Sequence, residues 1–225
     1  MDKSRTELLI GKEGLNKLAS KHITVVGCGG VGGYTAVMLA RAGVENITII
    51  DFDVVSPSNI NRQIIAYEDT IGMQKTEVLA KMIKKINKNI KITAIFTKLT
   101  SENVSSLIKE TDFVIDAIDS VEDKKALIIY CKKHNINIVS AMGAGNRSDI
   151  PVFEVVDIFK TYNDGLAKVM RKCLREEGIK DLKVVTTFSK PQVASRPVGS
   201  ISYYPAMCGC TISAWVINEI LEEKI

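Results

Sequence analysis

The fold of this chain is decided by one stretch, Ile23-Thr24-Val25-Val26-Gly27-Cys28-Gly29-Gly30-Val31-Gly32. Its first four residues are a β-branched run typical of a buried strand, and the remainder is a G-x-G-x-x-G motif. Apolar residues then recur at helical spacing over residues 31–42, and Gly43 stands where a helix should end. Glycines at such a turn let a phosphate approach the backbone N–H groups that begin the helix. The stretch therefore predicts a nucleotide-binding βαβ unit.

Strands and helices continue to alternate after this motif. Further strands are expected at residues 47–50, 90–96, 113–115 and 136–140, and helices at residues 75–87, 104–109 and 123–133. Alternation of this kind gives a parallel sheet with helices on both faces. The predicted fold class is therefore α/β, with a Rossmann-like, doubly wound and mainly parallel sheet.

A less regular C-terminal extension follows residue 141. It has expected strands at residues 153–156 and 183–187, and expected helices at residues 165–177 and from about residue 206. No linker-like composition separates the two parts. We therefore predict a single domain over residues 1–225, with a nucleotide-binding core at about residues 21–140 and a substrate-side extension at about residues 141–225. The polar loop at residues 189–199 is the expected mobile segment.

The composition excludes several classes of protein. Hydrophobic residues make up 46% of the chain and charged residues 25%, which is ordinary for a globular protein. The longest apolar run, residues 206–221, is shorter than a membrane span, and the N-terminus lacks a signal-peptide pattern, so a cytoplasmic protein is expected. The net charge of +4 permits a nucleic-acid partner without requiring one.

The five cysteines are odd in number and scattered along the chain. Neither a disulfide framework nor a zinc site is expected from this pattern, because a closed zinc site needs four ligands at characteristic spacings. Cys208-Gly209-Cys210 is interpreted as a run of small residues that lets a helix pack closely.

Asp51 is placed to bind the ribose of a nucleotide. It ends the second strand, 19 residues after Gly32, at the position of the ribose-binding acid of dinucleotide sites. In the expected strand order 3-2-1-4, the turn from Asp116 to Asp119 lies at the same edge of the sheet. These features alone do not separate an NAD-dependent dehydrogenase from an enzyme that binds ATP.

Three further side chains favour ATP. Arg62 and Lys75 add cations where a triphosphate would extend, and Asp119 adds a carboxylate suited to Mg²⁺. In proteins Mg²⁺ takes one or two carboxylates and otherwise binds water and phosphates. The sequence therefore predicts phosphoryl or nucleotidyl transfer at this edge.

The motifs together resemble those of the ThiF/MoeB/ubiquitin-activating (E1-like) adenylating enzymes over nearly the whole chain. The resemblance rests on Gly27-x-Gly29-Gly30-x-Gly32, Asp51-Phe52-Asp53, Asn59-x-x-Arg62-Gln63, Gly72-x-x-Lys75 and Asp116-x-x-Asp119. It implies that ATP and Mg²⁺ are the cofactors and that the chain forms a homodimer. The implied nucleotide-binding residues are Gly27, Gly29, Gly30, Gly32, Asp51, Asp53, Asn59, Arg62, Gln63, Lys75 and Asp119.

The same resemblance implies particular roles for these residues. Asp51 would hold the ribose, while Asn59, Arg62 and Lys75 would contact the phosphates and Asp119 would position Mg²⁺. Arg5 resembles an N-terminal arginine that reaches the ATP of the partner subunit. The implied catalytic residues are Arg5, Arg62, Lys75 and Asp119.

Two departures from the general pattern resemble one branch, the tRNA threonylcarbamoyladenosine dehydratases. The chain lacks the paired C-x-x-C motifs of members that activate sulfur carriers, and Asp119-Ser120 replaces the more common Asp-Asn. That branch uses ATP to activate the carboxylate of N6-threonylcarbamoyladenosine at position 37 of tRNA, which then cyclises. It also suggests a monovalent cation as a further ligand and a sulfur-transfer protein as a further partner. The predicted tRNA surface comprises Lys160, Lys168, Arg171, Lys172, Arg175, Lys180 and Lys183.

Two other functions stay open from the sequence. One is an adenylyltransferase that activates the C-terminal Gly-Gly of a ubiquitin-like sulfur carrier. The other is an NAD-binding dehydrogenase or a catalytically silent Rossmann binding module, which would leave Arg62, Lys75 and Asp119 without a shared purpose.

Overall fold

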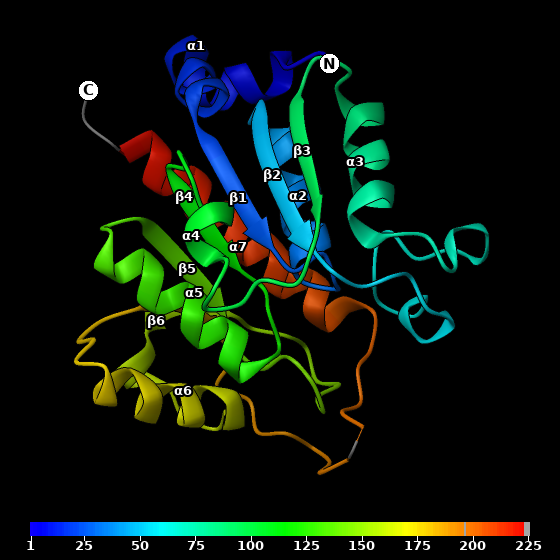
Figure 1. Cartoon of the computed structure of the whole chain (residues 1–225). Coiled ribbons are helices and arrows are strands. Elements are labelled where there is room, and N and C mark those ends of the chain that lie inside the picture. Colours follow the sequence, from blue (N-terminus) through cyan, green and yellow to red (C-terminus); the bar gives the residue numbers. More distant parts are fainter. Residues whose placement is uncertain (196, 223–225) are drawn as a thin grey trace.

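One seven-stranded sheet forms the centre of the molecule (Figure 1). The computed structural model describes residues 1–195 and 197–222, so the last three residues of the predicted domain lie outside the described part. The strand order is β3-β2-β1-β4-β5-β7-β6. The strands are β1 (His22–Val26), β2 (Asn46–Asp51), β3 (Lys91–Phe96), β4 (Phe113–Asp116), β5 (Asn137–Ala141), β6 (Glu154–Asp157) and β7 (Lys183–Thr186).

The pairing of the strands confirms the predicted doubly wound sheet. β1 lies between β2 and β4 and is parallel to both, with Val26 opposite Ile50 on one side and Asp116 on the other. β5 and β7 continue the parallel arrangement, whereas β6 runs antiparallel to β7 at the edge. Because the parallel strands share one direction, the residues that follow β1, β2 and β4 meet at a single edge of the sheet.

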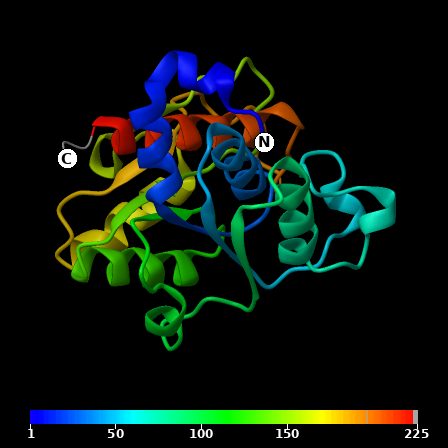
Figure 2. The same cartoon turned by 90° about the horizontal axis from the view of Figure 1, so that it is seen from above.

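Helices cover both faces of the sheet, as Figure 2 shows from above. Buried residues of α2, α3 and α7, with Leu18 of α1, form the core on one face, and those of α4, α5 and α6 form the core on the other. The α-helices are α1 (Ser4–Ser20), α2 (Gly32–Ala42), α3 (Lys75–Ile86), α4 (Val104–Leu107), α5 (Val121–Lys133), α6 (Gly165–Glu176) and α7 (Tyr203–Glu222). The 3-10 helices are η1 (Pro57–Asn59), η2 (Glu68–Thr70) and η3 (Ile158–Lys160).

The packing of α7 against α2 confirms the interpretation of the Cys208-Gly209-Cys210 run. A Cβ atom at Gly209 would lie 2.5 Å from the carbonyl oxygen of Val31, so only glycine permits this approach of the two helices. Cys208 beside it is fully buried, and burial raises the pKa of its thiol to about 12. Among the described residues, no helix combines the length and the apolarity needed to cross a membrane.

The loop at residues 189–199 is attached to the body of the protein at Asn146. The backbone N–H of Gln192 donates to the Asn146 carbonyl oxygen at 2.8 Å, and Ser195 Oγ and the Gly199 N–H donate to Asn146 Oδ1 at 2.8 and 2.7 Å. Residue 196 of this loop lies outside the described residues. The expected mobility of the loop stays a prediction.

Candidate functional site

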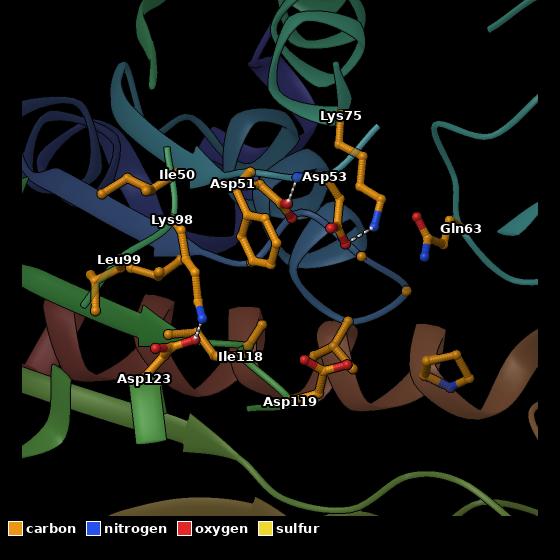
Figure 3. A pocket seen from close by; sticks show the side chains of 18 of the residues that line it. Ile50, Asp51, Asp53, Gln63, Lys75, Lys98, Leu99, Ile118, Asp119 and Asp123 are labelled. Atoms are coloured by element: carbon orange, nitrogen blue, oxygen red, sulfur yellow. Dashed lines mark hydrogen bonds and ion pairs between the residues drawn. The ribbon is translucent and has the colours of Figure 1, made fainter. Parts of the chain in front are cut away.

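A pocket opens at the edge of the sheet where β1, β2 and β4 end (Figure 3). The glycine turn after β1 forms one wall, and the segments that follow β2, β3 and β4 form the others. Its lining residues are Val26, Gly27, Gly29, Gly30, Val31, Ile50, Asp51, Phe52, Asp53, Arg62, Gln63, Lys75, Thr97, Lys98, Leu99, Ala117, Ile118, Asp119, Asp123 and Pro205. The sheet topology therefore gathers segments from distant parts of the chain around one cavity.

The glycine turn is built so tightly that two of its glycines are required. Gly27 has a φ of +93°, and a Cβ atom there would lie 2.6 Å from the carbonyl oxygen of Ala117. A Cβ atom at Gly32 would lie only 1.8 Å from the carbonyl oxygen of Gly27. The absence of side chains thus lets the turn close on itself and against the segment after β4, with the N-terminus of α2 facing the pocket.

Asp51 organises the middle of the pocket. Its Oδ2 accepts a hydrogen bond from the Cys28 N–H at 2.6 Å, and its Oδ1 accepts one from the Asp53 N–H at 2.7 Å. A carboxylate has about four acceptor sites, so these two bonds leave capacity for further donors. The carboxylate of Asp51 therefore fixes the turns after β1 and β2 and can still accept from hydroxyl groups of a ligand.

Cations and amides gather at one end of the pocket. Lys75 is nearly buried, and its Nζ lies 2.8 Å from Asp53 Oδ2. Arg62 Nη1 donates to the Ser58 carbonyl oxygen at 2.6 Å, which holds the half-buried guanidinium against η1. Gln63 Oε1 is buried and has no hydrogen-bond partner among the residues that the structure describes. This end therefore offers donors to an anion and one acceptor that still requires a donor.

Asp119 lies on the exposed turn after β4, across the pocket from Lys75 (Figure 3). Asp116, at the end of β4, shapes this turn because its Oδ1 accepts from the Ile118 N–H at 3.1 Å. Asp116 is itself held by a fully buried ion pair, with its Oδ2 2.8 Å from Lys124 Nζ. The carboxylate of Asp119 is thus presented from a turn with a rigid, buried base.

The structure brings most of the predicted site residues together. Those that line the pocket are Gly27, Gly29, Gly30, Asp51, Asp53, Arg62, Gln63, Lys75 and Asp119. Gly32 lies within the turn behind the pocket and serves its close packing. Asn59 is buried in η1, where its Oδ1 accepts from the Ser56 N–H at 3.1 Å, and it is not among the lining residues.

Arg5 lies away from the pocket of its own chain. The neighbouring Lys3 forms an ion pair of 2.6 Å with Glu45, which directly precedes β2. This places the start of α1 at the amino-terminal edge of the sheet, opposite the pocket (Figure 1). Any contact of Arg5 with a nucleotide thus requires the pocket of a second copy.

Sequence reasoning missed the residues that form the opposite end of the pocket. Lys98, Leu99, Ile118 and Asp123 line this end (Figure 3), and Phe52 lies beside them, with its ring centroid 5.9 Å from Lys98 Nζ. Two signals were available: Lys98 and Leu99 follow the end of β3, and Asp123 lies in the first turn of α5, the helix that begins directly after the Asp119-Ser120 turn.

The cysteines do not furnish a reactive thiol at this pocket. Cys28 in the glycine turn is fully buried, and burial followed by the nearby Asp51 carboxylate raises the pKa of its thiol well above the ordinary value. The described residues contain no group of three or more His, Cys, Asp or Glu side chains that could hold a metal ion by themselves. A metal ion at Asp119 would therefore need ligands from a bound molecule and from water.

Part of the predicted tRNA surface lies on the exposed face of α6. Lys168, Lys172 and Arg175 are exposed and follow one another at intervals of four and three residues along α6. Arg171 instead donates to the carbonyl oxygen of Thr161 at 3.0 Å, so its guanidinium supports the loop before α6. The exposed basic side chains of α6 are therefore fewer than the basic residues in its sequence.

Comparison with known proteins identifies the family. The ThiF family model matches residues 3–224 of this chain. A tRNA threonylcarbamoyladenosine dehydratase of Bacillus subtilis is 35% identical over 98% of this chain and 94% of that protein, and the one from Escherichia coli is 42% identical over 76% of this chain and 65% of that protein. The crystal structure of the E. coli enzyme in complex with ATP superposes with a TM-score of 0.92 at 34% identity, covering 97% of this chain and 93% of that one. The chain therefore belongs to the ThiF family, and its similarity to the tRNA threonylcarbamoyladenosine dehydratases extends over nearly its whole length.

Proposed function

We propose that this chain is an ATP-dependent tRNA threonylcarbamoyladenosine dehydratase, which converts N6-threonylcarbamoyladenosine at position 37 of tRNA into its cyclic form. The observation that carries the proposal is the pocket, which unites a glycine turn, the Asp51 carboxylate at the end of β2, two cations and an exposed carboxylate at one edge of the sheet. The near full-length similarity to the dehydratase from Bacillus subtilis supports the choice of substrate. A substrate of this kind accords with a cytoplasmic location.

The two ends of the pocket differ in chemistry, which favours one orientation of the nucleotide. Asp51 lies between them, with Lys75 and Gln63 toward one end and Leu99 and Asp123 toward the other (Figure 3). With the ribose at Asp51, the phosphates extend toward the cations and the N-terminus of α2, where backbone N–H groups favour anions. The base then occupies the end that includes Leu99.

The residues at the phosphate end fit a hydrated magnesium ion. Mg²⁺ keeps several of its water molecules and is usually bound through one or two carboxylates together with substrate phosphates. Asp119 supplies one exposed carboxylate, and the unpartnered Gln63 Oε1 can accept a hydrogen bond from a metal-bound water. When bound, Mg²⁺ would neutralise charge on the triphosphate.

The chemistry requires alignment and charge neutralisation more than a side-chain nucleophile. The substrate carboxylate oxygen attacks the α-phosphorus of ATP, the bond to pyrophosphate breaks, and an acyl-adenylate forms. Lys75 and Arg62 stabilise the negative charge on the phosphates during this step. A nucleophile on the same modified base then attacks the activated carbonyl and expels AMP, and its tethering gives this step a high effective molarity.

The tRNA and a second copy of the chain complete the proposed assembly. The exposed basic residues of α6 form a surface for the tRNA backbone, because lysine and arginine side chains neutralise phosphates. In a homodimer, Arg5 of one protomer would reach the nucleotide pocket of its partner. Leu8 and Leu9 on the same segment are 79% and 87% exposed, which leaves apolar surface for such a contact.

The proposal is tested by mass spectrometry of nucleosides from tRNA that carries N6-threonylcarbamoyladenosine. After incubation with the protein, ATP and Mg²⁺, the modified nucleoside should lose the mass of one water, and omission of ATP should prevent the loss. Unchanged nucleoside with intact ATP binding would refute the proposal. Pyrophosphate exchange that depends on a sulfur-carrier protein with a C-terminal Gly-Gly, and not on tRNA, would establish the adenylyltransferase alternative.

A further inference from the structure

A charged pair stands at the base end of the nucleotide pocket. Lys98 follows β3, Asp123 belongs to the first turn of α5, and Lys98 Nζ lies 3.4 Å from Asp123 Oδ2 (Figure 3). Both side chains line the pocket, together with the apolar Leu99 and Ile118. The function proposed above assigns no role to this pair, because it places the ribose and the phosphates at the other residues.

The two members of the pair are buried to very different extents. The side chain of Asp123 is only 10% exposed, whereas that of Lys98 is 53% exposed. No hydrogen bond to the Asp123 carboxylate is found among the described residues, so its acceptor sites are little used. Burying a carboxylate is costly unless it is paired and hydrogen-bonded. This carboxylate is thus a strong acceptor in a partly apolar cavity with a single, half-exposed counter-charge.

An ordinary helix-end role does not account for this position. An acidic side chain in the first turn of a helix stabilises it from the surface by interaction with the helix dipole. Glu122, the preceding residue, is exposed in the same turn and can fill this role for α5. Asp123 instead points into the pocket, where its oxygens are available to a bound molecule (Figure 3).

We propose that Asp123 selects purine nucleotides with an amino group at C6 over those with an oxo group at C6. The inference rests on the proposed function only in taking the base to lie at this end of the pocket. A carboxylate accepts hydrogen bonds and cannot donate them. The 6-amino group of adenine donates to it, whereas a 6-oxo group brings a second acceptor against a buried negative charge. Lys98, whose side chain is half exposed, supplies the counter-charge to this carboxylate.

The experiment is calorimetric titration of the full-length protein with ATP and, separately, with ITP, which carries a 6-oxo group without the 2-amino group of GTP. A hydrogen bond to a charged acceptor predicts that the wild-type protein binds ATP roughly 10- to 100-fold more tightly than ITP. In Asp123→Asn the ratio should fall to within about threefold, because an amide can accept from the amino group or donate to the oxo group. Glu122→Gln, which removes a neighbouring exposed charge from the same turn, should keep the wild-type ratio.

Asp123→Ala supplies a second variant, since it removes both the attraction and the repulsion and should also bring the ratio near one. A wild-type protein that binds both nucleotides equally, or an Asp123→Asn variant that keeps the wild-type preference, would overturn the inference. The inference would also be overturned if the Asp123 variants changed the magnesium dependence of ATP binding but kept the wild-type ratio of ATP to ITP affinity. If the protein shows the predicted preference but does not dehydrate tRNA, the proposed function fails while the role of Asp123 stands. If the protein dehydrates tRNA but the ratio of ATP to ITP affinity does not depend on Asp123, the proposed function stands and the role of Asp123 fails.

Discussion

Replacing Lys124 by methionine should destabilise the protein strongly, because it leaves a buried carboxylate without its counter-charge. Lys124 and Asp116 are both fully buried, with Nζ and Oδ2 2.8 Å apart. Lys124 Nζ also donates to Ser140 Oγ at 3.1 Å and to the Ala141 carbonyl oxygen at 3.0 Å, so its hydrogen-bonding capacity is filled. Ser140 Oγ donates in turn to Asp116 Oδ2 at 2.6 Å. The network joins β4, β5 and α5 directly beneath the turn that carries the pocket residues.

The expected magnitude follows from this burial. Removing one partner of a buried ion pair costs about 3–5 kcal/mol in the free energy of unfolding. In a chain of 225 residues, 1 kcal/mol lowers the thermal midpoint by about 2–4 °C, so Lys124→Met should lower it by about 6–20 °C. The double variant Lys124→Met/Asp116→Asn should be more stable than Lys124→Met, because the introduced amide is neutral and its oxygen can still accept from the Ile118 N–H.

Urea denaturation followed by circular dichroism, together with thermal melting, measures these differences. Lys125→Met is the matched control, because Lys125 is the next residue along α5 and pairs with Glu177 at the surface. Its loss should move the midpoint little, as is usual for exposed ion pairs. A cost below about 1 kcal/mol for Lys124→Met, or a double variant less stable than the single one, would refute the reasoning.

Three further outcomes are expected. Asp119→Ala should lower turnover by about 100-fold or more in a steady-state assay and leave the thermal midpoint unchanged, since Asp119 is exposed. Asp69→Ala is the control for removal of an exposed carboxylate. Full activity of Asp119→Ala would remove Asp119 from the mechanism. Arg5→Ala should lose activity alone but regain it when mixed and re-equilibrated with Asp119→Ala, because each mixed dimer then contains one complete site; a mixture as inactive as its components would exclude action across the interface. Iodoacetamide should leave Cys28 unmodified in the native protein, since burial removes access and raises the pKa of its thiol, while the half-buried Cys173 is labelled; mass spectrometry of Cys28 peptides decides this.

The central sheet could be predicted because each strand carries its own local signal. β1 and β2 are short runs rich in β-branched residues, and β1 leads into the glycine turn while β2 ends at Asp51. Such continuous apolar runs are typical of parallel strands that are buried on both faces. α1 could not be predicted from apolar spacing, because Leu8 and Leu9 face solvent and Gly11 interrupts the helix with a φ of 69°. The antiparallel β6 is an edge strand whose direction is set by the preceding connection, a property that residue patterns do not encode.

The site could be predicted where its residues end a strand or lie in the turn directly after one. Asp51 and Asp119 are of this kind, because topology alone brings strand ends to one edge. Asn59 does not follow a strand, and its Oδ1 caps η1 beside the pocket residues Arg62 and Gln63, so its contact with a phosphate stays a prediction. Lys98 and Asp123 were missed because their meeting depends on how the β3–α4 loop crosses the start of α5, which only the folded chain specifies.

The central claim is that ATP activates the substrate carboxylate as an adenylate in this pocket, and isotope tracing tests it most directly. A tRNA would be prepared with the heavy oxygen isotope in the threonyl carboxylate of its modified nucleoside. It would then be incubated with the protein, ATP and Mg²⁺. Because the carboxylate oxygen bonds to the α-phosphorus and departs with it, the account predicts heavy oxygen in AMP and unlabelled pyrophosphate. Formation of ADP with the heavy oxygen in inorganic phosphate would contradict the account. AMP that contains no heavy oxygen would contradict it as well.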